Sequence, residues 1–233
     1  MELSKLEKAI SYEFKDRDLL KEALTHRSYL NENPKWGLPN NERLEFLGDA
    51  VLELAVTEEL YKRFPDYQEG KMTGIRAALV NYVMLAEVAK SFGLERFVLL
   101  SRGETKDTGR ARDVILANAI EALMGAIYLD SGHKSVNKFV KNFVISRLDM
   151  VMKQGLFKDP KSLLQEKIQE EKKVTPIYKV LSETGPDHAK VFEVGVYVGG
   201  ELLARGQGVS KQDAETEAAR QALGGYKSGT QGR

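Results

Sequence analysis

The sequence predicts an all-α part up to about residue 155, followed by a compact α+β module of the order α-β-β-β-α. Two observations support this prediction. Before residue 155, apolar residues recur every three or four positions, as in helices packed on a core, and no strand pattern of any length occurs. After Gly155, short runs of alternating or continuous apolar residues stand between two helical segments, which indicates strands.

The predicted elements of the all-α part follow from this spacing. Two short helices fill residues 1–30, and a loop that contains the only Trp, Trp36, spans residues 31–40. Asn40 or Asn41 can cap a long acidic helix that runs to about Phe64, where Pro65 stops it. The rest is expected to be a helix at 71–92 closed by Gly93, a short apolar piece at 94–100, a charged loop at 101–112, and helices at 114–129 and 136–152.

The module after Gly155 is expected to contain a helix at 161–172, strands at 177–182, 192–198 and 202–204, and a helix at 210–223. A tight turn at Gly199-Gly200 joins the last two strands. We place the all-α domain at residues 1–151, a linker at 152–158, the α+β domain at 159–226 and a small, polar, flexible tail at 227–233.

Composition limits the classes of function. The formal net charge is +1, with 12 basic and 11 acidic residues from Lys158 onward and 23 of each before it. Polyanion binding must therefore come from local placement of charge. The absence of Cys excludes disulfides, thiolate zinc sites and cysteine nucleophiles, and it fits a reducing cytoplasm. We expect neither a signal peptide nor a membrane span, since no apolar run approaches 18 residues.

The acidic helix has two faces at about 100° per residue. One face is apolar and would be buried; it holds Leu44, Leu47, Val51, Leu54 and Ala55. The other carries four acids at spacings of three and four: Glu42, Glu45, Asp49 and Glu53. Like charges stacked in this way repel by a few tenths of a kcal/mol per pair, so the row is either a solvated face or a cation site. Phe46 lies on the acidic side, where an aromatic ring needs a partner surface to cover it.

The helix at 114–129 has a related pattern. Opposite its apolar face lie Asn118 and Glu121, with Gly125 one turn further on, where the missing side chain leaves room for another chain or a ligand. Two helices with oxygen ligands on one stripe can converge on a hard cation such as Mg²⁺. Such carboxylates serve phosphodiester cleavage at two-metal sites. Spacing alone leaves a solvated acidic face as the alternative.

The segment Asn41–Ala50, Asn-Glu-Arg-Leu-Glu-Phe-Leu-Gly-Asp-Ala, resembles the signature of bacterial ribonuclease III. The likeness continues through Thr-His-Arg-Ser-Tyr at 25–29, Glu69-Gly70 and residues 115–123, and it covers essentially the whole chain. The resemblance implies an endonuclease domain that cuts double-stranded RNA with Mg²⁺, for which Mn²⁺ can substitute, and an activated water. It further implies 5′-phosphate and 3′-hydroxyl ends with a short 3′ overhang, and cytoplasmic processing of structured RNA such as ribosomal RNA precursors and messenger RNA.

The resemblance also implies roles for single residues. Glu45, Asp49 and Glu121 match metal-site positions of the family, and Glu42 and Glu69 match supporting acidic positions of the same catalytic valley. Phe46 matches an aromatic residue that inserts into the partner subunit. This match implies a twofold homodimer that makes one cut per strand.

Asn118 departs from the family pattern, which has Asp at this metal-ligand position. An amide still offers one neutral oxygen to Mg²⁺, but it removes a negative charge from a site that holds dications. Two explanations stay open: a deliberate inactivating change that traps bound RNA, or natural divergence. Our hypothesis is that the chain binds RNA but cleaves it poorly.

Residues 159–226 resemble a double-stranded RNA-binding domain, which reads ribose-phosphate shape through three elements. The first is a stripe of its first helix, which is otherwise an ordinary polar face: Ser162, Gln165, Glu166 and Gln169. The second is the loop 185–190, which has His188 at the groove-contacting position and Lys190 two residues later in the sequence. The third is the start of the last helix, where Ser210 is the cap and Lys211 is followed by Gln212 instead of the family's second Lys. We therefore expect weaker and less salt-sensitive RNA binding.

Some features allow more than one interpretation. In the loop 101–112, Lys106, Arg110 and Arg112 either are solvated or contact the RNA backbone. His26 is expected to be a hydrogen-bonded structural residue, not a ligand. For the whole chain, the alternatives to an RNA-cleaving enzyme are a binding-only protein, which Asn118 favours, and an acidic-faced helical scaffold with an appended module. The placement of Phe46 and the RNA-loop motifs argue against the scaffold.

Overall fold

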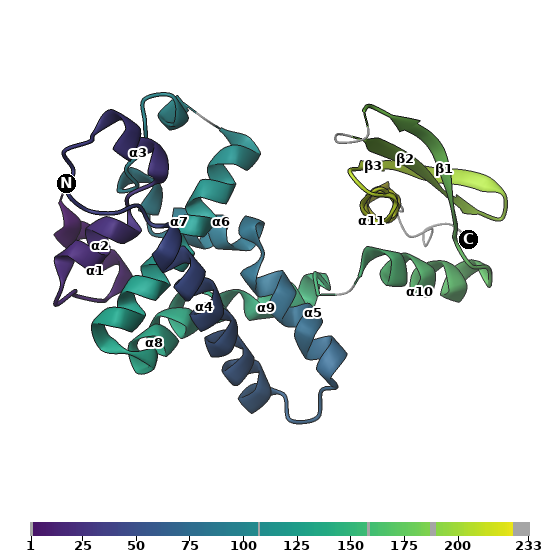
Figure 1. Cartoon of the computed structure of the whole chain (residues 1–233). Coiled ribbons are helices and arrows are strands. Elements are labelled where there is room, and N and C mark those ends of the chain that lie inside the picture. The colour runs from purple at the N-terminus through teal and green to yellow at the C-terminus, as the bar shows by residue number, and fades with distance from the viewer. Residues whose placement is uncertain (1, 107, 158, 187–189, 226–233) are drawn as a thin grey trace. The chain divides into compact units, whose positions relative to one another are not determined.

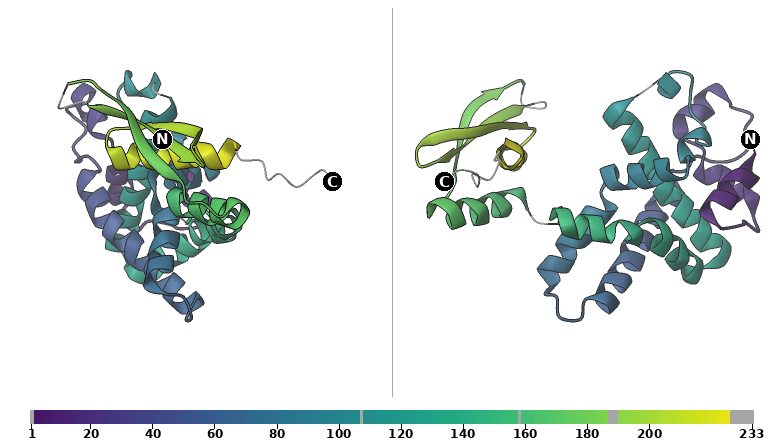
Figure 2. Two further views of the ribbon diagram at one scale, coloured as in Figure 1. Left: turned by 90° about the vertical axis from the view of Figure 1, so that its right-hand side faces the viewer. Right: turned by 180° about the vertical axis from the view of Figure 1, so that it is seen from behind.

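The computed structural model describes residues 2–106, 108–157, 159–186 and 190–225, and the chain divides into two compact units, Met1–Phe157 and Lys158–Arg233. The first unit is helical, and the second is a three-stranded sheet with two helices (Figures 1 and 2). Each unit has its own hydrophobic core. The predicted fold class, all-α followed by α-β-β-β-α, is confirmed.

The helical unit contains nine α-helices among the described residues. They are α1 (Leu3–Ile10), α2 (Arg17–Ala23), α3 (Arg27–Glu32), α4 (Glu42–Arg63), α5 (Glu69–Val80), α6 (Tyr82–Ser91), α7 (Gly109–Ser131), α8 (His133–Phe143) and α9 (Leu148–Gln154). Short 3-10 turns η1 (Leu94–Arg96), η2 (Glu104–Lys106) and η3 (Ile145–Arg147) lie between them. The one isolated β-bridge in the described part of this unit joins Thr25 to Leu99.

Two helices that the sequence predicted as continuous are broken. The segment expected at 71–92 divides at Asn81, whose backbone is extended with ψ of 156°. The Asn81 side chain accepts a hydrogen bond from the Met84 amide at 3.0 Å and donates to the Ala78 carbonyl at 3.0 Å, so it caps both helices. The segment expected at 136–152 is likewise interrupted by η3. Apolar spacing continues across both breaks, so periodicity alone does not show them.

Helix α7 lies at the centre of the unit and packs against α2, α4, α6 and α8. Its predicted apolar residues, Leu116, Ile120, Leu123 and Ile127, are all fully or almost fully buried. Within the described ranges, α7 is the one helix that is by itself long and apolar enough to cross a membrane. The bent pair α5–α6 would be long and apolar enough only if both helices were counted as one span. The burial of α7 among other helices is that of a core helix.

Helix α4 buries most of the face that the sequence indicated. Leu44, Val51 and Ala55 are buried, and Leu47 packs at the edge of the core. Leu54 was predicted wrongly, because it is 52% exposed. It shares a line on the helix with Tyr61, seven residues later and 73% exposed, and so belongs to the outer face.

The start of α4 distinguishes the two predicted capping residues. Asn40, not Asn41, accepts a hydrogen bond from the Glu42 amide, at 3.2 Å. Asn41 is buried, and its side chain donates to the Ala23 carbonyl at 3.3 Å. The second Asn therefore ties the beginning of α4 to α2.

The second unit consists of α10 (Pro160–Lys172), β1 (Ile177–Thr184), β2 (Val191–Val198), β3 (Glu201–Gly208) and α11 (Lys211–Gly225), with antiparallel strand order β1-β2-β3. Gly199 and Gly200 have positive φ angles of 60° and 91° and form the predicted turn. Strand β3 is longer than the predicted 202–204, because glycines interrupt its apolar pattern. A Cβ on Gly206 would lie 2.1 Å from the Ala218 amide nitrogen, so the glycine lets α11 approach the strand closely.

The boundary between the units lies later than predicted. Residues 152–154 belong to α9, and Phe157 packs against the core of the first unit, although we expected the linker to begin at 152. A Cβ on Gly74 would lie 2.4 Å from the Phe157 carbonyl oxygen, which shows how closely this segment contacts α5. The predicted tail at 227–233 lies outside the described residues.

Candidate active site

Helices α4 and α7 cross at two glycines. A Cβ on Gly48 would lie 1.7 Å from the carbonyl oxygen of Glu121, and one on Gly125 would lie 2.3 Å from the carbonyl oxygen of Leu44. The sequence suggested that Gly125 admits another chain or a ligand, but the backbone of α4 fills this space. The two backbones are therefore in direct contact beside the acidic residues of both helices.

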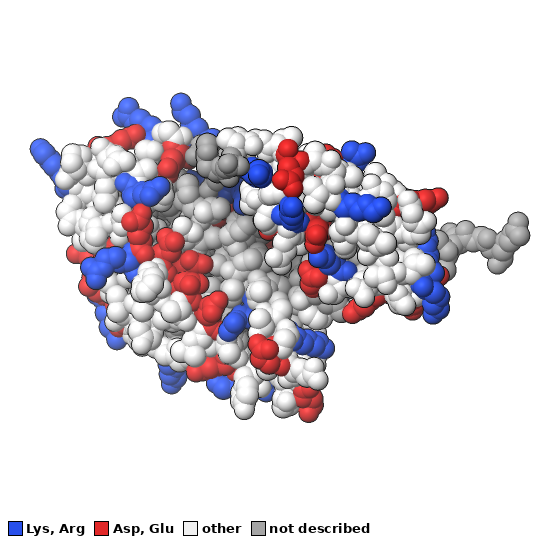
Figure 3. Space-filling view, turned by 45° about the vertical axis from the view of Figure 1, so that its right-hand side comes forward, with Lys and Arg blue, Asp and Glu red and all other residues white. Residues whose placement is uncertain are grey.

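This crossing brings the predicted metal-site residues together. Burial, together with the charges of Asp49 and Glu45, raises the pKa of Glu121 to about 7. Burial and the charges of Glu42 and Asp49 raise the pKa of Glu45, whereas a side-chain hydrogen bond to Asn118 lowers it. All five residues thus belong to one electrostatically coupled cluster on two helices. Figure 3 shows Asp and Glu side chains gathered on the surface of the helical unit.

The cluster has the donors that a hard cation prefers. No ion pair joins Glu45, Asp49 or Glu121 to a Lys, Arg or His within the described ranges. The nearest ion pair is that of Glu42 with Arg27, at 3.7 Å between largely exposed side chains. Three carboxylates and one amide oxygen match Mg²⁺ chemistry. In the described part of the chain, no three His, Cys, Asp or Glu side chains are already close enough to hold an ion, so binding would require side-chain adjustment.

A hollow of about 740 Å³ adjoins the cluster, and Glu45, Asn118, Arg27 and Arg110 are among the residues that line it. His26, at its edge, is hydrogen-bonded as predicted: it caps α3 by accepting from the Ser28 amide at 3.3 Å. Burial lowers the pKa of His26, and the neighbouring Glu104 charge opposes this shift.

The three basic residues proposed for the loop 101–112 are not equivalent. Arg112 donates a hydrogen bond to the Glu95 carbonyl at 3.1 Å, and a second guanidinium nitrogen is buried. Its guanidinium therefore holds the start of α7 against η1, which disfavours contact with RNA. Lys106 is exposed, and Arg110 lies over the Tyr82 ring at 5.7 Å from its centroid, at the rim of the hollow.

Glu69 is not part of the cluster within one chain. It lies at the start of α5, where it accepts a hydrogen bond from the Thr73 hydroxyl at 2.8 Å. It faces Thr57 and Tyr61, which lie 8 and 12 residues beyond Asp49 on α4 and thus roughly 12–18 Å further along the helix axis. Sequence spacing could not show this separation.

The second unit presents the other predicted residues on its surface. Ser162, Gln165, Glu166 and Gln169 all lie exposed on α10. Asp159, which was not among the predicted caps, caps this helix by accepting from the Ser162 amide at 3.0 Å. Ser210 caps α11, as predicted, by accepting from the Asp213 amide at 3.1 Å, and Lys211 and Gln212 lie exposed in the first turn. His188 lies outside the described residues, and Lys190 directly precedes β2.

Comparison with known families agrees with this geometry. Residues 160–224 match the double-stranded RNA binding motif, and residues 16–148, more than half of the chain, match the Ribonuclease-III-like family. The chain belongs to the ribonuclease III family. This ribonuclease III is thus an endoribonuclease with a double-stranded RNA-binding domain, as the signature at 41–50 predicted.

Relatives of this ribonuclease III match it over nearly its full length. Ribonuclease 3 of Borreliella burgdorferi is 46% identical over 222 residues, which is 95% of this chain and 90% of that protein. Ribonuclease 3 of Symbiobacterium thermophilum is 47% identical over 216 residues, or 92% and 90%. The nuclease domain of Campylobacter jejuni ribonuclease III, described as having flexibility in a region involved in dimer formation, superposes with a TM-score of 0.56 and 42% identity over 62% of this chain and 96% of that chain.

The raised pKa of Glu121 predicts a pH-dependent stability of this ribonuclease III without metal. The folded-state pKa of about 7 exceeds the ordinary value of 4.5, so the folded state binds the proton more tightly, and stability is lost as the pH rises from about 4.5 through 7. Glu121→Gln should therefore stabilise the metal-free protein at pH 8 by about 1–2 kcal/mol, allowing for partial exposure, and have little effect at pH 4. Urea unfolding at both pH values measures this difference; equal effects at both would contradict the assignment.

Proposed function

We propose that this ribonuclease III hydrolyses double-stranded RNA in a Mg²⁺-dependent reaction that leaves 5′-phosphate and 3′-hydroxyl ends, acting in the cytoplasm on structured RNA such as ribosomal RNA precursors. The observation that carries this proposal is the convergence of Glu45, Asp49 and Glu121 beside a hollow, with no basic partner among the described residues. A dication among these carboxylates would counteract both the burial and the repulsion that raise the pKa of Glu121.

Glu45, Asp49, Asn118 and Glu121 would hold Mg²⁺, for which Mn²⁺ could substitute. When bound, the ion supplies activation of the attacking water and stabilisation of the leaving oxygen. The chain itself fixes the ligands: the glycine crossing sets α4 against α7, and the Asn118 hydrogen bond orients Glu45. Arg27 and Arg110 line the same hollow and could contact phosphates of a bound strand.

A cleavage-impaired RNA binder is the second candidate, and Asn118 favours it. The site has three carboxylates where the family pattern implies a fourth at position 118, so less negative charge is available to hold dications. Incubating the full chain with duplex RNA, with Mg²⁺ or with EDTA, tests both candidates. We expect retention of duplex over single-stranded RNA and slow cleavage that requires Mg²⁺. Equal cleavage in EDTA, or no preference for the duplex, would refute the proposal.

In the second unit, we propose that RNA contacts come from the exposed stripe of α10 and from the first turn of α11. The carboxamide and hydroxyl groups of Ser162, Gln165 and Gln169, together with Glu166, suit 2′-hydroxyl groups of a minor groove. Ser210, Lys211 and Gln212 surround a helix N-terminus that favours phosphate. His188 and Lys190 would contact the adjacent groove.

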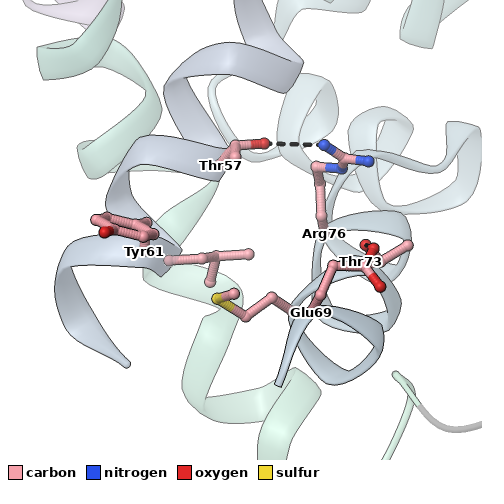
Figure 4. A pocket seen from close by; sticks show the side chains of 7 residues that line it. Thr57, Tyr61, Glu69, Thr73 and Arg76 are labelled. Carbon is pink, nitrogen blue, oxygen red and sulfur yellow. Dashed lines mark hydrogen bonds between the residues drawn. The ribbon is translucent and has the colours of Figure 1, made fainter. Parts of the chain in front are cut away.

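We propose that the chain acts as a homodimer through the outer face of α4. Phe46 is 84% exposed, and Leu54 and Tyr61 extend the apolar surface along the same helix. A groove of about 190 Å³ between α4 and α5 is lined by Leu60, Tyr61 and Met72, with Thr57 and Arg76 hydrogen-bonded at 3.0 Å at its other side (Figure 4). Phe46 of a second copy would fill this groove, and twofold symmetry would repeat the contact.

This dimer would also give Glu69 a role. Glu69 lines the same groove, and Phe46 is next to Glu45 and three residues before Asp49 in the sequence. A second copy's Phe46 in the groove would therefore place Glu69 close to that copy's acidic cluster. Glu69 of one copy would then lie near the acidic cluster of the other copy, which is why it need not lie near the cluster of its own chain.

Truncation of Phe46 should weaken the dimer. We expect Phe46→Ala to raise the dimer dissociation constant about 30-fold, since a buried aromatic anchor contributes about 2 kcal/mol or more. Sedimentation velocity over a concentration series measures the change. Val209→Ala is the control, because Val209 is 78% exposed in the other unit and should leave association unaltered. An unchanged constant for Phe46→Ala would refute this interface.

A further inference from the structure

An acidic residue of the second unit lies among its proposed RNA-binding lysines. The Glu183 carboxylate is 3.1 Å from the Lys211 ammonium through one oxygen and 4.0 Å from the Lys190 ammonium through the other. These residues come from the end of β1, the first turn of α11 and the segment before β2. The sheet register fixes the arrangement, because Glu183 pairs directly with Phe192, whose ring centroid is 5.6 Å from the Lys211 ammonium.

Two lysine ammonium groups beside one carboxylate resemble a phosphate-binding site. Here the Glu183 carboxylate takes the place that a phosphate would occupy between the two lysines. RNA phosphate that contacts Lys211 must compete with Glu183 for the same ammonium group. If the carboxylate stays nearby, it also repels the phosphate directly. Lys211 is 58% exposed, Lys190 37% and the carboxylate 39%, so the ion pairs are weak enough to exchange with a polyanion.

We propose that Glu183 is an internal phosphate competitor that limits the affinity of this domain for double-stranded RNA. This inference rests on the proposed RNA-binding role of Lys190 and Lys211. Neutralising Glu183 raises the local charge of the three groups from +1 to +2. The number of counterions displaced from RNA on binding should rise accordingly, and the salt dependence of binding should steepen.

The test compares Glu183→Gln with the unmodified full chain, binding to a blunt RNA duplex of about 20 base pairs in EDTA, which is long enough for the roughly 16 base pairs that such a domain spans. We expect affinity to rise about 3- to 10-fold at 0.1 M salt, and the slope of log K against log salt to become more negative by up to about 1. Glu193→Gln is the matched control: Glu193 also pairs with a cation, Arg205 at 3.4 Å, and it follows Phe192 on β2, so its side chain lies on the opposite face of the sheet from the Phe192 ring beside Lys211. It removes the same charge from the same domain.

A second comparison separates competition from an indirect effect. In a Lys190→Gln/Lys211→Gln background, Glu183→Gln should give no gain beyond that of Glu193→Gln, because the cations that it releases are absent. Equal affinities of Glu183→Gln and Glu193→Gln, or a lower affinity of Glu183→Gln, would overturn the inference. Failure of every variant to prefer duplex over single-stranded RNA would instead overturn the proposed function.

Discussion

Asn118→Asp should raise the Mg²⁺-dependent cleavage of duplex RNA by two orders of magnitude or more. The substitution returns a negative charge beside Glu45, Asp49 and Glu121, where the proposed ion would stabilise transition-state charge by several kcal/mol, and each 1.4 kcal/mol changes a rate tenfold. The side chains are nearly isosteric, so the helix crossing should persist. Single-turnover cleavage across a Mg²⁺ titration measures the change and should show half-saturation at lower Mg²⁺.

Asn142→Asp is the matched control, since Asn142 is exposed on α8 and the change adds the same charge to the same unit. It should leave the cleavage rate within a factor of about two. Equal rates for the chain and its Asn118→Asp variant would show that the charge at 118 does not limit cleavage. Binding to duplex RNA in EDTA should be similar in all three proteins, which separates chemistry from affinity.

Gly48→Ala should destabilise the helical unit by about 3–5 kcal/mol, because the added carbon would lie 1.7 Å from the backbone oxygen of Glu121. The position of a Cβ is fixed by its own backbone and no rotamer change moves it, so α4 and α7 must separate and lose packing along their crossing. We expect the helical transition, followed by circular dichroism at 222 nm, to occur about 10 °C lower.

Gly70→Ala is the control for the loss of a helical glycine. Gly70 lies in the first turn of α5, and a Cβ there would meet nothing within 4 Å. The change should be neutral or stabilising by up to about 1 kcal/mol, since alanine restricts the unfolded chain. If the two variants unfold at the same temperature, the crossing is looser than the glycine geometry requires.

The sequence predicted those parts of the fold that depend on local patterns. Apolar spacing located α4, α7, α10 and α11, and two adjacent glycines located the turn between β2 and β3. It did not show the break at Asn81, because one extended residue leaves the spacing of apolar side chains intact. It also placed Leu54 inside, since spacing does not define how wide the buried stripe is.

The candidate site likewise divides into residues that local sequence patterns indicate and contacts that depend on the tertiary structure. Glu45, Asp49 and Glu121 could be predicted as site residues because each lies on a polar stripe of one helix and in a segment that resembles the family. Gly48 was not recognised as a contact point, and Gly125 was assigned to the wrong neighbour, because a crossing depends on residues about 75 positions apart. The inward turn of Arg112 and the pairing of Lys211 with Glu183 are likewise tertiary contacts that composition does not contain.

The enclosure of α7 by α2, α4, α6 and α8 has a consequence for partial unfolding. Amide protons at Asn118 and Glu121 are protected by the most enclosed helix of the unit, so they should exchange only when the whole unit opens. Fraying of α1 or of the segment after α9 leaves α4 and α7 in contact. A partly opened molecule therefore keeps its acidic residues together, and the proposed metal site should be lost only in the same step as the fold.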